Sequence, residues 1–222
     1  MTNTLDVTIA TTHQVLAERL RLASAGVSAG ATPRDVQQYA DTFLASTCRH
    51  MCAANTVLVP AARQWLPDGA ERRRGFHRQS RRLDLALRQV KSKVYGDAYA
   101  VQRSWSDVWD DARTEFEATA RLERQIVDAL MASIGVRASD ALANRLYLTE
   151  VKAPTRPHPY APRAGTSALL ARLIWARADR FWDGLEGRAI PTSTGVRTRP
   201  RRGLMTQYVM GNPADEATAE AS

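Results

Sequence analysis

Apolar residues recur at alternating steps of four and three in four successive stretches of this chain. In the stretch Thr47–Arg63, the positions on one side are Thr47, His50, Ala54, Val57 and Ala61. Residues with this spacing form one stripe along an α-helix. In all four seams the spacing between successive seam residues averages about 3.5. Four helices with this spacing, joined by short connections, are typical of an up-down-up-down bundle. We therefore predict an all-α fold built on a four-helix bundle.

The breaks between these stretches set the bounds of the helices. We predict helices over about 8–24, 33–65 and 71–94, a fourth between Gly96 and Gly135, and a short one over about 139–151. Together they make one bundle domain over residues 1–150.

The remainder of the chain has a different character. Residues 151–164 contain four prolines and are predicted to form an extended linker. Residues 165–190 are predicted to form an amphipathic helix carrying Trp175 and Trp182. This helix either docks against the bundle or binds a partner or a membrane surface. The polar residues 191–222 are expected to form a flexible tail.

Composition is that of an ordinary globular protein. With 222 residues, of which 44% are hydrophobic, the chain is long enough for one domain with a sizeable core. The N-terminal residues lack a signal-peptide pattern and no stretch is apolar enough for a membrane span, so we expect a cytoplasmic location. Cys48 and Cys52 lie four apart on one predicted helix and are interpreted as small buried or half-buried thiols.

The charge is unbalanced, with 31 Lys and Arg against 23 Asp and Glu and a net charge of +8. The excess is concentrated in residues 71–82 and 196–202, and we expect a basic loop near Arg72–Arg82. An acidic partner or a membrane surface could bind there. No nucleic-acid motif accompanies these runs, and aromatic residues do not alternate with the basic ones. A solvated surface is the simpler interpretation.

Each predicted helix of the bundle also carries a polar residue on its apolar seam. These residues are His13, His50, Ser80, Thr119 and Glu123. A buried polar group without a partner costs roughly 1–3 kcal/mol, so these side chains need one another or a bound ion. Ligand sites inside helix bundles are assembled from facing side chains of this kind.

In this pattern the chain resembles the hemerythrin (HHE cation-binding) family, whose bundle holds two irons through His and acidic ligands. The second helix of that family reads His-x-x-x-Glu, then an apolar pair and a proline. Here the same register holds His50, Ala54, Leu58, Val59 and Pro60. The resemblance covers roughly residues 8–132, and the chain from Ala153 onward is similar to the tail appended to some actinobacterial members.

The other ligand positions of the family also map onto this chain. The first-helix His corresponds to His13, the third-helix His to Ser80, and the fourth-helix His-x-x-x-Glu to Thr119 and Glu123. The resemblance thus implies a degenerate site, in which Ala54 replaces a carboxylate and two hydroxyls replace imidazoles. Such a site cannot hold two irons.

His13, His50 and Glu123 remain, the donor set of a mononuclear 2-His-1-carboxylate site that suits iron. His77, three residues before Ser80, is a weaker further ligand. Alternatively, Glu123 pairs with the two imidazoles and no metal binds.

Three functions stay open at this point. The first is a hemerythrin-like protein with a degenerate site and a binding or regulatory role. The second is a mononuclear non-haem iron protein that reacts with or senses O2, peroxide or NO. The third is a basic interaction module for an acidic partner or membrane surface. The sequence contains no nucleophile–base set, phosphate-binding loop or zinc spacing, which favours a binding role over an enzyme.

Overall fold

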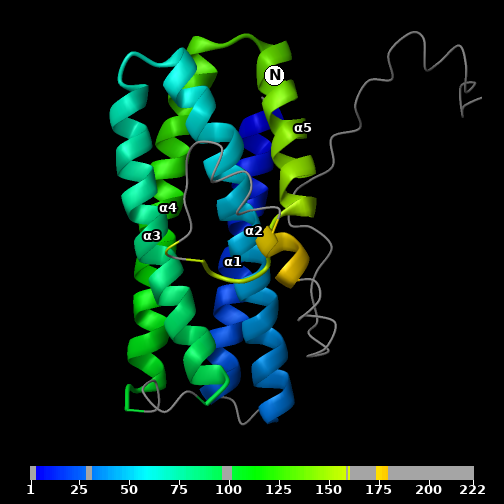
Figure 1. Cartoon of the computed structure of the whole chain (residues 1–222), viewed down its shortest axis with the longest axis vertical. Helices are drawn as coiled ribbons and strands as arrows, with labels where there is room; N and C mark the ends of the chain where they lie inside the picture. Colours follow the sequence, from blue (N-terminus) through cyan, green and yellow to red (C-terminus); the bar gives the residue numbers. More distant parts are fainter. Residues whose placement is uncertain (1–3, 29–31, 97–101, 159, 161–173, 180–222) are drawn as a thin grey trace, which may run out of the picture.

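The computed structural model describes residues 4–28, 32–96, 102–158, 160 and 174–179. These residues form five packed helices, and none of them lies in a strand (Figure 1). The helices are α1 (Thr4–Ser28), α2 (Pro33–Trp65), α3 (Gly69–Val94), α4 (Trp105–Ser133) and α5 (Val136–Lys152). The predicted all-helical class is confirmed.

The ends of α2 follow the local sequence signals. The Thr32 hydroxyl accepts a hydrogen bond from the Asp35 amide at 3.3 Å, and Pro33 occupies the first helical position. At the other end, Pro67 and Asp68 lead into Gly69. A Cβ atom at residue 69 would lie 2.1 Å from the Ala62 carbonyl oxygen, so only glycine fits this turn.

Two helices extend beyond their predicted bounds. α1 begins at Thr4 rather than near Thr8, because Leu5 continues the apolar seam one turn earlier and is fully buried. α5 begins at Val136 and buries Ser139, Leu142 and Leu146. The segment expected to be a minor helix is therefore packed into the body of the protein.

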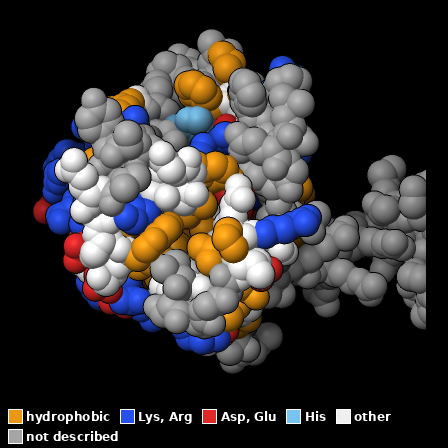
Figure 2. Space-filling view, turned by 90° about the horizontal axis from the view of Figure 1, so that it is seen from below, with side chains coloured by type: hydrophobic (Ala, Val, Ile, Leu, Met, Phe, Trp, Pro, Cys, Tyr) orange, Lys and Arg blue, Asp and Glu red, His pale blue; other side chains and the backbone are white. Residues whose placement is uncertain are grey.

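α2 lies at the centre of the arrangement and contacts all four other helices. α3 and α4 pack against each other, α1 contacts α4, and α5 lies against α1 and α2. Large side chains fill the space between them, among them Phe43, whose ring lies 6.2 Å from that of Trp109 and 6.3 Å from that of Phe116. Seen end-on, hydrophobic side chains lie towards the middle and most Lys and Arg towards the edge (Figure 2).

The proline-rich segment after α5 is held against the protein where it is described. The Asp179 carboxylate accepts hydrogen bonds from the Thr155 and Arg156 amides at 2.9 and 3.0 Å. Its Oδ2 atom also lies 3.3 Å from Nε2 of His158, and the Trp175 ring stacks on that imidazole at 4.4 Å. His158 is half-buried because of these contacts.

Residues 174–179 of the predicted amphipathic helix are helical and pack back on this segment, with Ala176 and Asp179 buried. Trp182, the rest of that helix and the expected tail lie outside the described residues. No described helix combines the length and apolar content that crossing a bilayer requires. The expected basic loop near Arg72–Arg82 is wrong, because these residues form the first half of α3.

Candidate metal centre

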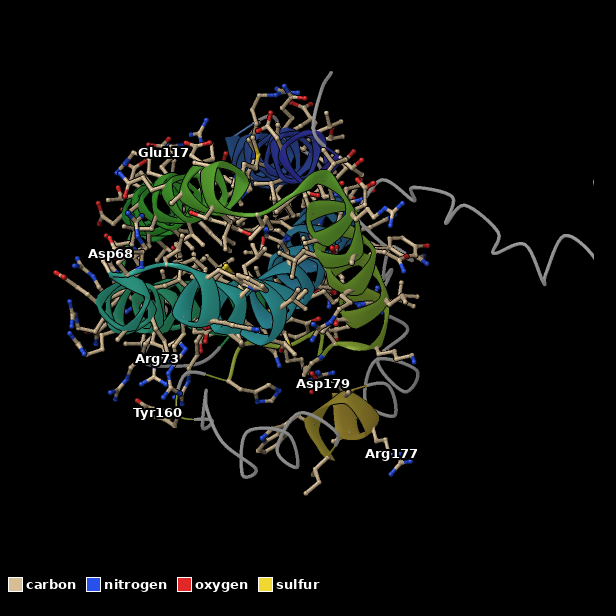
Figure 3. The ribbon with its side chains drawn as sticks, turned by 90° about the horizontal axis from the view of Figure 1, so that it is seen from above. Asp68, Arg73, Glu117, Tyr160, Arg177 and Asp179 are labelled. Carbon is tan, nitrogen blue, oxygen red and sulfur yellow. The ribbon has the colours of Figure 1, made fainter. Side chains whose placement is uncertain are left out.

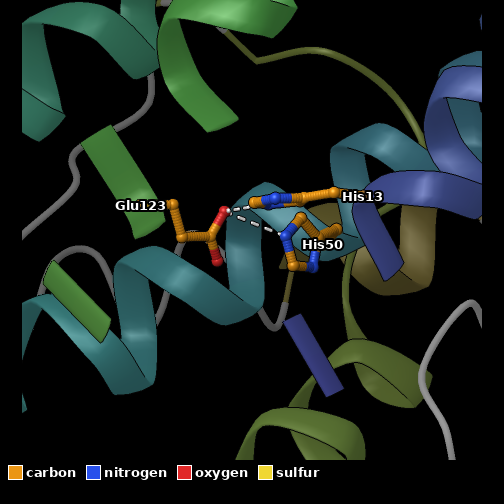
Figure 4. A group of neighbouring side chains, drawn as sticks. All are labelled: His13, His50 and Glu123. Atoms are coloured by element: carbon orange, nitrogen blue, oxygen red, sulfur yellow. Dashed lines mark hydrogen bonds and ion pairs between the residues drawn. The ribbon is translucent and has the colours of Figure 1, made fainter. Parts of the chain in front are cut away.

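His13 on α1, His50 on α2 and Glu123 on α4 meet inside the protein (Figure 4). The Nε2 atoms of the two imidazoles each lie 3.0 Å from the same oxygen, Oε2 of Glu123. One ligand atom from each residue lies within 4.8 Å of the other two. Three residues separated by up to 110 positions in the sequence thus converge on one point.

The seams of the helices explain why these side chains turn inward. His13 lies between the buried Ile9 and Leu16 on α1. His50 lies one turn before Ala54, which is fully buried on the same side of α2. The two imidazoles pack edge to face, with ring centroids 5.5 Å apart. His50 and Glu123 are 1% exposed, whereas the His13 side chain keeps 11% exposure at the edge of the site.

Burial and charge act against each other at the centre of this site. Burial alone would raise the pKa of Glu123, but the charge of His50 and hydrogen bonds from both imidazoles hold it well below its ordinary value. Burial alone would lower the pKa of His50, yet the charge and hydrogen bond of Glu123 and the charge of Glu150 raise it to about 8. The carboxylate is therefore ionised and His50 is largely protonated at neutral pH.

A fourth ionisable residue, Glu150 of α5, completes the site from the other side of His50. Its Oε2 atom lies 4.0 Å from Nδ1 of His50, and its side chain is 1% exposed. Glu150 also interacts electrostatically with Arg19 of α1. Burial lowers the pKa of the Arg19 guanidinium, and the negative charge of Glu150 opposes this shift. Arg19 also donates a hydrogen bond to the Ser46 hydroxyl.

Sequence reasoning missed Glu150, although a signal for it was present. Ser139, Leu142, Leu146 and Glu150 follow one another at helical steps of three and four, and all are buried. Glu150 is thus a carboxylate on the apolar side of a helix, as Glu123 is. The helix predicted over about 139–151 therefore carries a polar seam residue of the same kind as the four longer helices.

The other ligand positions that the resemblance implied do not join the cluster. The Ser80 hydroxyl donates to the Phe76 carbonyl at 2.8 Å, and Thr119 donates to the Glu115 carbonyl at 2.7 Å. Each hydroxyl is therefore bonded to its own helix. Ala54 is fully buried, and His77, the weaker candidate, lies half-buried on α3 outside the group of possible ligands.

No family model matches this chain, nor does any curated protein or solved structure. The site itself must therefore indicate the function.

The three residues fit a transition-metal ion. Two imidazole nitrogens and one carboxylate oxygen are donors that first-row metals bind well, and three protein ligands leave coordination positions open. At the site, Oε1 of Glu123 and the Nδ1 atoms of His13 and His50 are buried without a hydrogen-bond partner in the described part of the chain. A buried carboxylate beside two imidazoles needs a positive charge nearby, which either a protonated imidazole or a bound cation can supply.

Proposed function

We propose that this chain is a hemerythrin-like helical protein that binds one first-row transition-metal ion, with iron as the favoured metal, through His13, His50 and Glu123. The observation that carries the proposal is the approach of two Nε2 atoms to the same buried carboxylate oxygen, each at 3.0 Å. The role we infer is binding or regulatory.

The bundle part of the proposal is that α1 to α4 form an up-down-up-down four-helix bundle to which α5 is added. Consecutive helices pack against each other, and α1 also contacts α4, which would close the set of four. The helices lie alongside one another in Figure 1. The three proposed ligands come from the helices that the resemblance to hemerythrins implies.

The proposal specifies one metal ion rather than two. A second ion would need the carboxylate that Ala54 lacks and the imidazoles that Ser80 and Thr119 replace. The hydroxyls of these two residues are neutral, and each already donates to a carbonyl of its own helix. Reversible oxygen carriage by two bridged irons is therefore not proposed.

The chain's own residues would have distinct tasks around such an ion. The two imidazoles would bind it, Glu123 would bind it and offset one of its charges, and Glu150 would hold His50 from behind. The coordination positions that remain would admit a small molecule such as O2, peroxide or NO. His13 is the most exposed of the three ligands, so its edge offers the shortest path from solvent.

The test is elemental analysis of protein purified without chelators, followed by anaerobic Fe(II) titration of the metal-free form. We expect about one metal ion per chain, lost in His50→Ala and in Glu123→Ala. His77→Ala removes an imidazole outside the cluster and is the matched control, which should bind metal normally.

If no metal co-purifies and none binds on titration, the proposal fails. The two imidazoles and Glu123 then form a metal-free ion pair, and the bundle is a scaffold. Binding of two metal ions per chain would also contradict the proposal, because it specifies a single site.

A further inference from the structure

The positive charge of this protein is concentrated on one helix. α3 contains nine Lys and Arg and two Asp and Glu, a net charge of +7, while the whole chain has a net charge of +8. The other helices and segments together are thus nearly neutral. This asymmetry is independent of the candidate metal centre.

Four of these arginines form a single exposed stripe. Arg74, Arg78, Arg81 and Arg88 follow at steps of four, three and seven, and all are exposed. Residues at this spacing point to the same side of a helix. At 1.5 Å per residue the stripe is roughly 21 Å long, about the length of six stacked nucleotides at 3.4 Å each.

Neighbouring arginines of α3 are neutralised, but the stripe is not. Arg72 pairs with Asp68 at 2.8 Å, and Arg82 with Glu115 at 3.0 Å. Within the described part of the chain, no carboxylate lies at ion-pair distance from any arginine of the stripe. These guanidinium groups are available to an anionic partner.

An aromatic ring lies within the stripe although it is distant in the sequence. The guanidinium carbons of Arg81 and Arg88 lie 5.7 and 5.9 Å from the centre of the Tyr160 ring, at cation–π distance. Tyr160 is 69% exposed, so much of its ring surface remains open. Figure 3 shows it on the same side of the molecule as Arg73. The sequence alone could not reveal this alternation of arginine and aromatic residues.

We propose that the arginine stripe and Tyr160 bind single-stranded nucleic acid without sequence preference. An arginine guanidinium can donate two parallel hydrogen bonds to one phosphate group, and it also stacks on aromatic rings. An exposed aromatic ring beside basic side chains can stack on a nucleic-acid base whatever the sequence. A membrane surface is disfavoured, because α3 itself exposes no large hydrophobic side chain, and Tyr160 is a single ring rather than the apolar helix face that enters a bilayer.

The probe is a fluorescently labelled oligothymidylate of about 20 nucleotides, added to the full chain at 50 and 200 mM salt. With four phosphate contacts, binding should weaken about 50-fold between these salt concentrations. Arg81→Gln/Arg88→Gln should roughly halve the slope of log affinity against log salt. Tyr160→Ala should weaken binding about tenfold, and Tyr160→Phe should bind like the original protein.

The matched control is Arg124→Gln/Arg137→Gln, which removes the same charge from exposed positions of α4 and α5. Circular dichroism and thermal unfolding verify that each variant is folded. The further variant Arg81→Lys/Arg88→Lys retains the positive charge but lacks the flat guanidinium group. Preserved binding in the control pair, together with weakened binding in the stripe variants, supports the proposal.

Several results would overturn it. These are absence of binding at 50 mM salt, equal weakening by the control pair, and no effect of Tyr160→Ala. Equal or tighter binding of a duplex of the same length would also refute a single-strand surface. Binding confined to vesicles with anionic lipid, or to polyglutamate, would assign the stripe to a membrane or an acidic protein instead.

Discussion

Nδ1 of His50 lies 4.0 Å from Oε2 of Glu150, while Nε2 of the same ring faces Glu123 at 3.0 Å. The imidazole therefore lies between two buried carboxylates, hydrogen-bonded to the one from α4 and at ion-pair distance from the one from α5. A carboxylate that accepts a hydrogen bond from the second nitrogen of a metal-binding imidazole fixes the ring and raises the basicity of the ligand nitrogen, and Glu150 is the residue placed to take this role for His50. This relationship makes α5 part of the candidate metal centre.

Replacement of Glu150 should weaken metal binding without removing a ligand. We expect Glu150→Ala to lower the affinity for Fe(II) or Co(II) by about 10- to 100-fold at unchanged stoichiometry. Glu150→Gln keeps an acceptor oxygen and should lose less. Anaerobic metal titrations measure both, with Glu117→Gln on the exposed side of α4 as the control. Wild-type affinity in Glu150→Ala would show that Glu150 does not act on the metal through His50.

Metal binding should compete with a proton on His50. An ionised carboxylate only accepts hydrogen bonds, so in the metal-free protein the Nε2 atom that faces Glu123 carries a hydrogen. Because the pKa of His50 is about 8, a metal that binds this nitrogen at pH 7 must release a proton.

We therefore expect metal affinity to rise about tenfold per pH unit up to about pH 8 and then to level off. Affinity measured by titration between pH 6 and 9 checks this dependence. Calorimetry in buffers of different ionisation enthalpy counts the released proton. An affinity that stays constant across this interval would mean that His50 does not bind the metal through Nε2.

The metal-free protein should have its own pH optimum of stability. The pKa of His50 rises from 6.5 to about 8 on folding, so its contribution of about 2 kcal/mol is complete below pH 6.5 and lost as the pH rises through 8. The pKa of Glu123 is lowered, so its contribution is present above about pH 4.5 and lost as the pH falls below that value.

Stability of the metal-free form should therefore be greatest between about pH 4.5 and 6.5. Urea unfolding as a function of pH measures it, and His50→Gln should lose the decline between pH 6.5 and 8. If the variant and the original protein decline in parallel, groups other than His50 cause the change.

The sequence was informative where helical periodicity repeats over many turns. The seams of α1, α2 and α4 placed His13, His50 and Glu123 on inward sides, and packing of those sides brings the three together. Glu150 continues the same kind of seam after Ser139, Leu142 and Leu146, but in a short helix few turns define the buried side.

Other features could not be predicted from periodicity. Tyr160 reaches Arg81 and Arg88 through a proline-rich segment whose path depends on tertiary contacts. Asp179 likewise binds amides more than 20 residues earlier, which no local pattern encodes. The identity of the metal and of any small ligand also lies beyond residue spacing, since several first-row metals share this donor set.

Asp179 should anchor the segment that follows α5. Asp179 is 2% exposed and its carboxylate accepts hydrogen bonds from the amides of Thr155 and Arg156, so Asp179→Ala removes the acceptor of both bonds. Each buried donor without a partner costs about 1–3 kcal/mol, a cost that release of the segment into solvent would avoid. We therefore expect the segment to detach locally while α1–α4 stay folded.

Limited proteolysis with trypsin should then cleave Asp179→Ala after Lys152, where the segment begins, about tenfold faster than the original protein, with little change in the main thermal transition. Arg177→Ala, at an exposed position two residues away, is the control and should be cleaved at the original rate. Glu150 lies only a few residues before this segment. The metal affinity of Asp179→Ala therefore tests whether fixing the segment also helps to keep Glu150 beside His50. Unchanged proteolysis would mean that the Trp175–His158 stack holds the segment without Asp179.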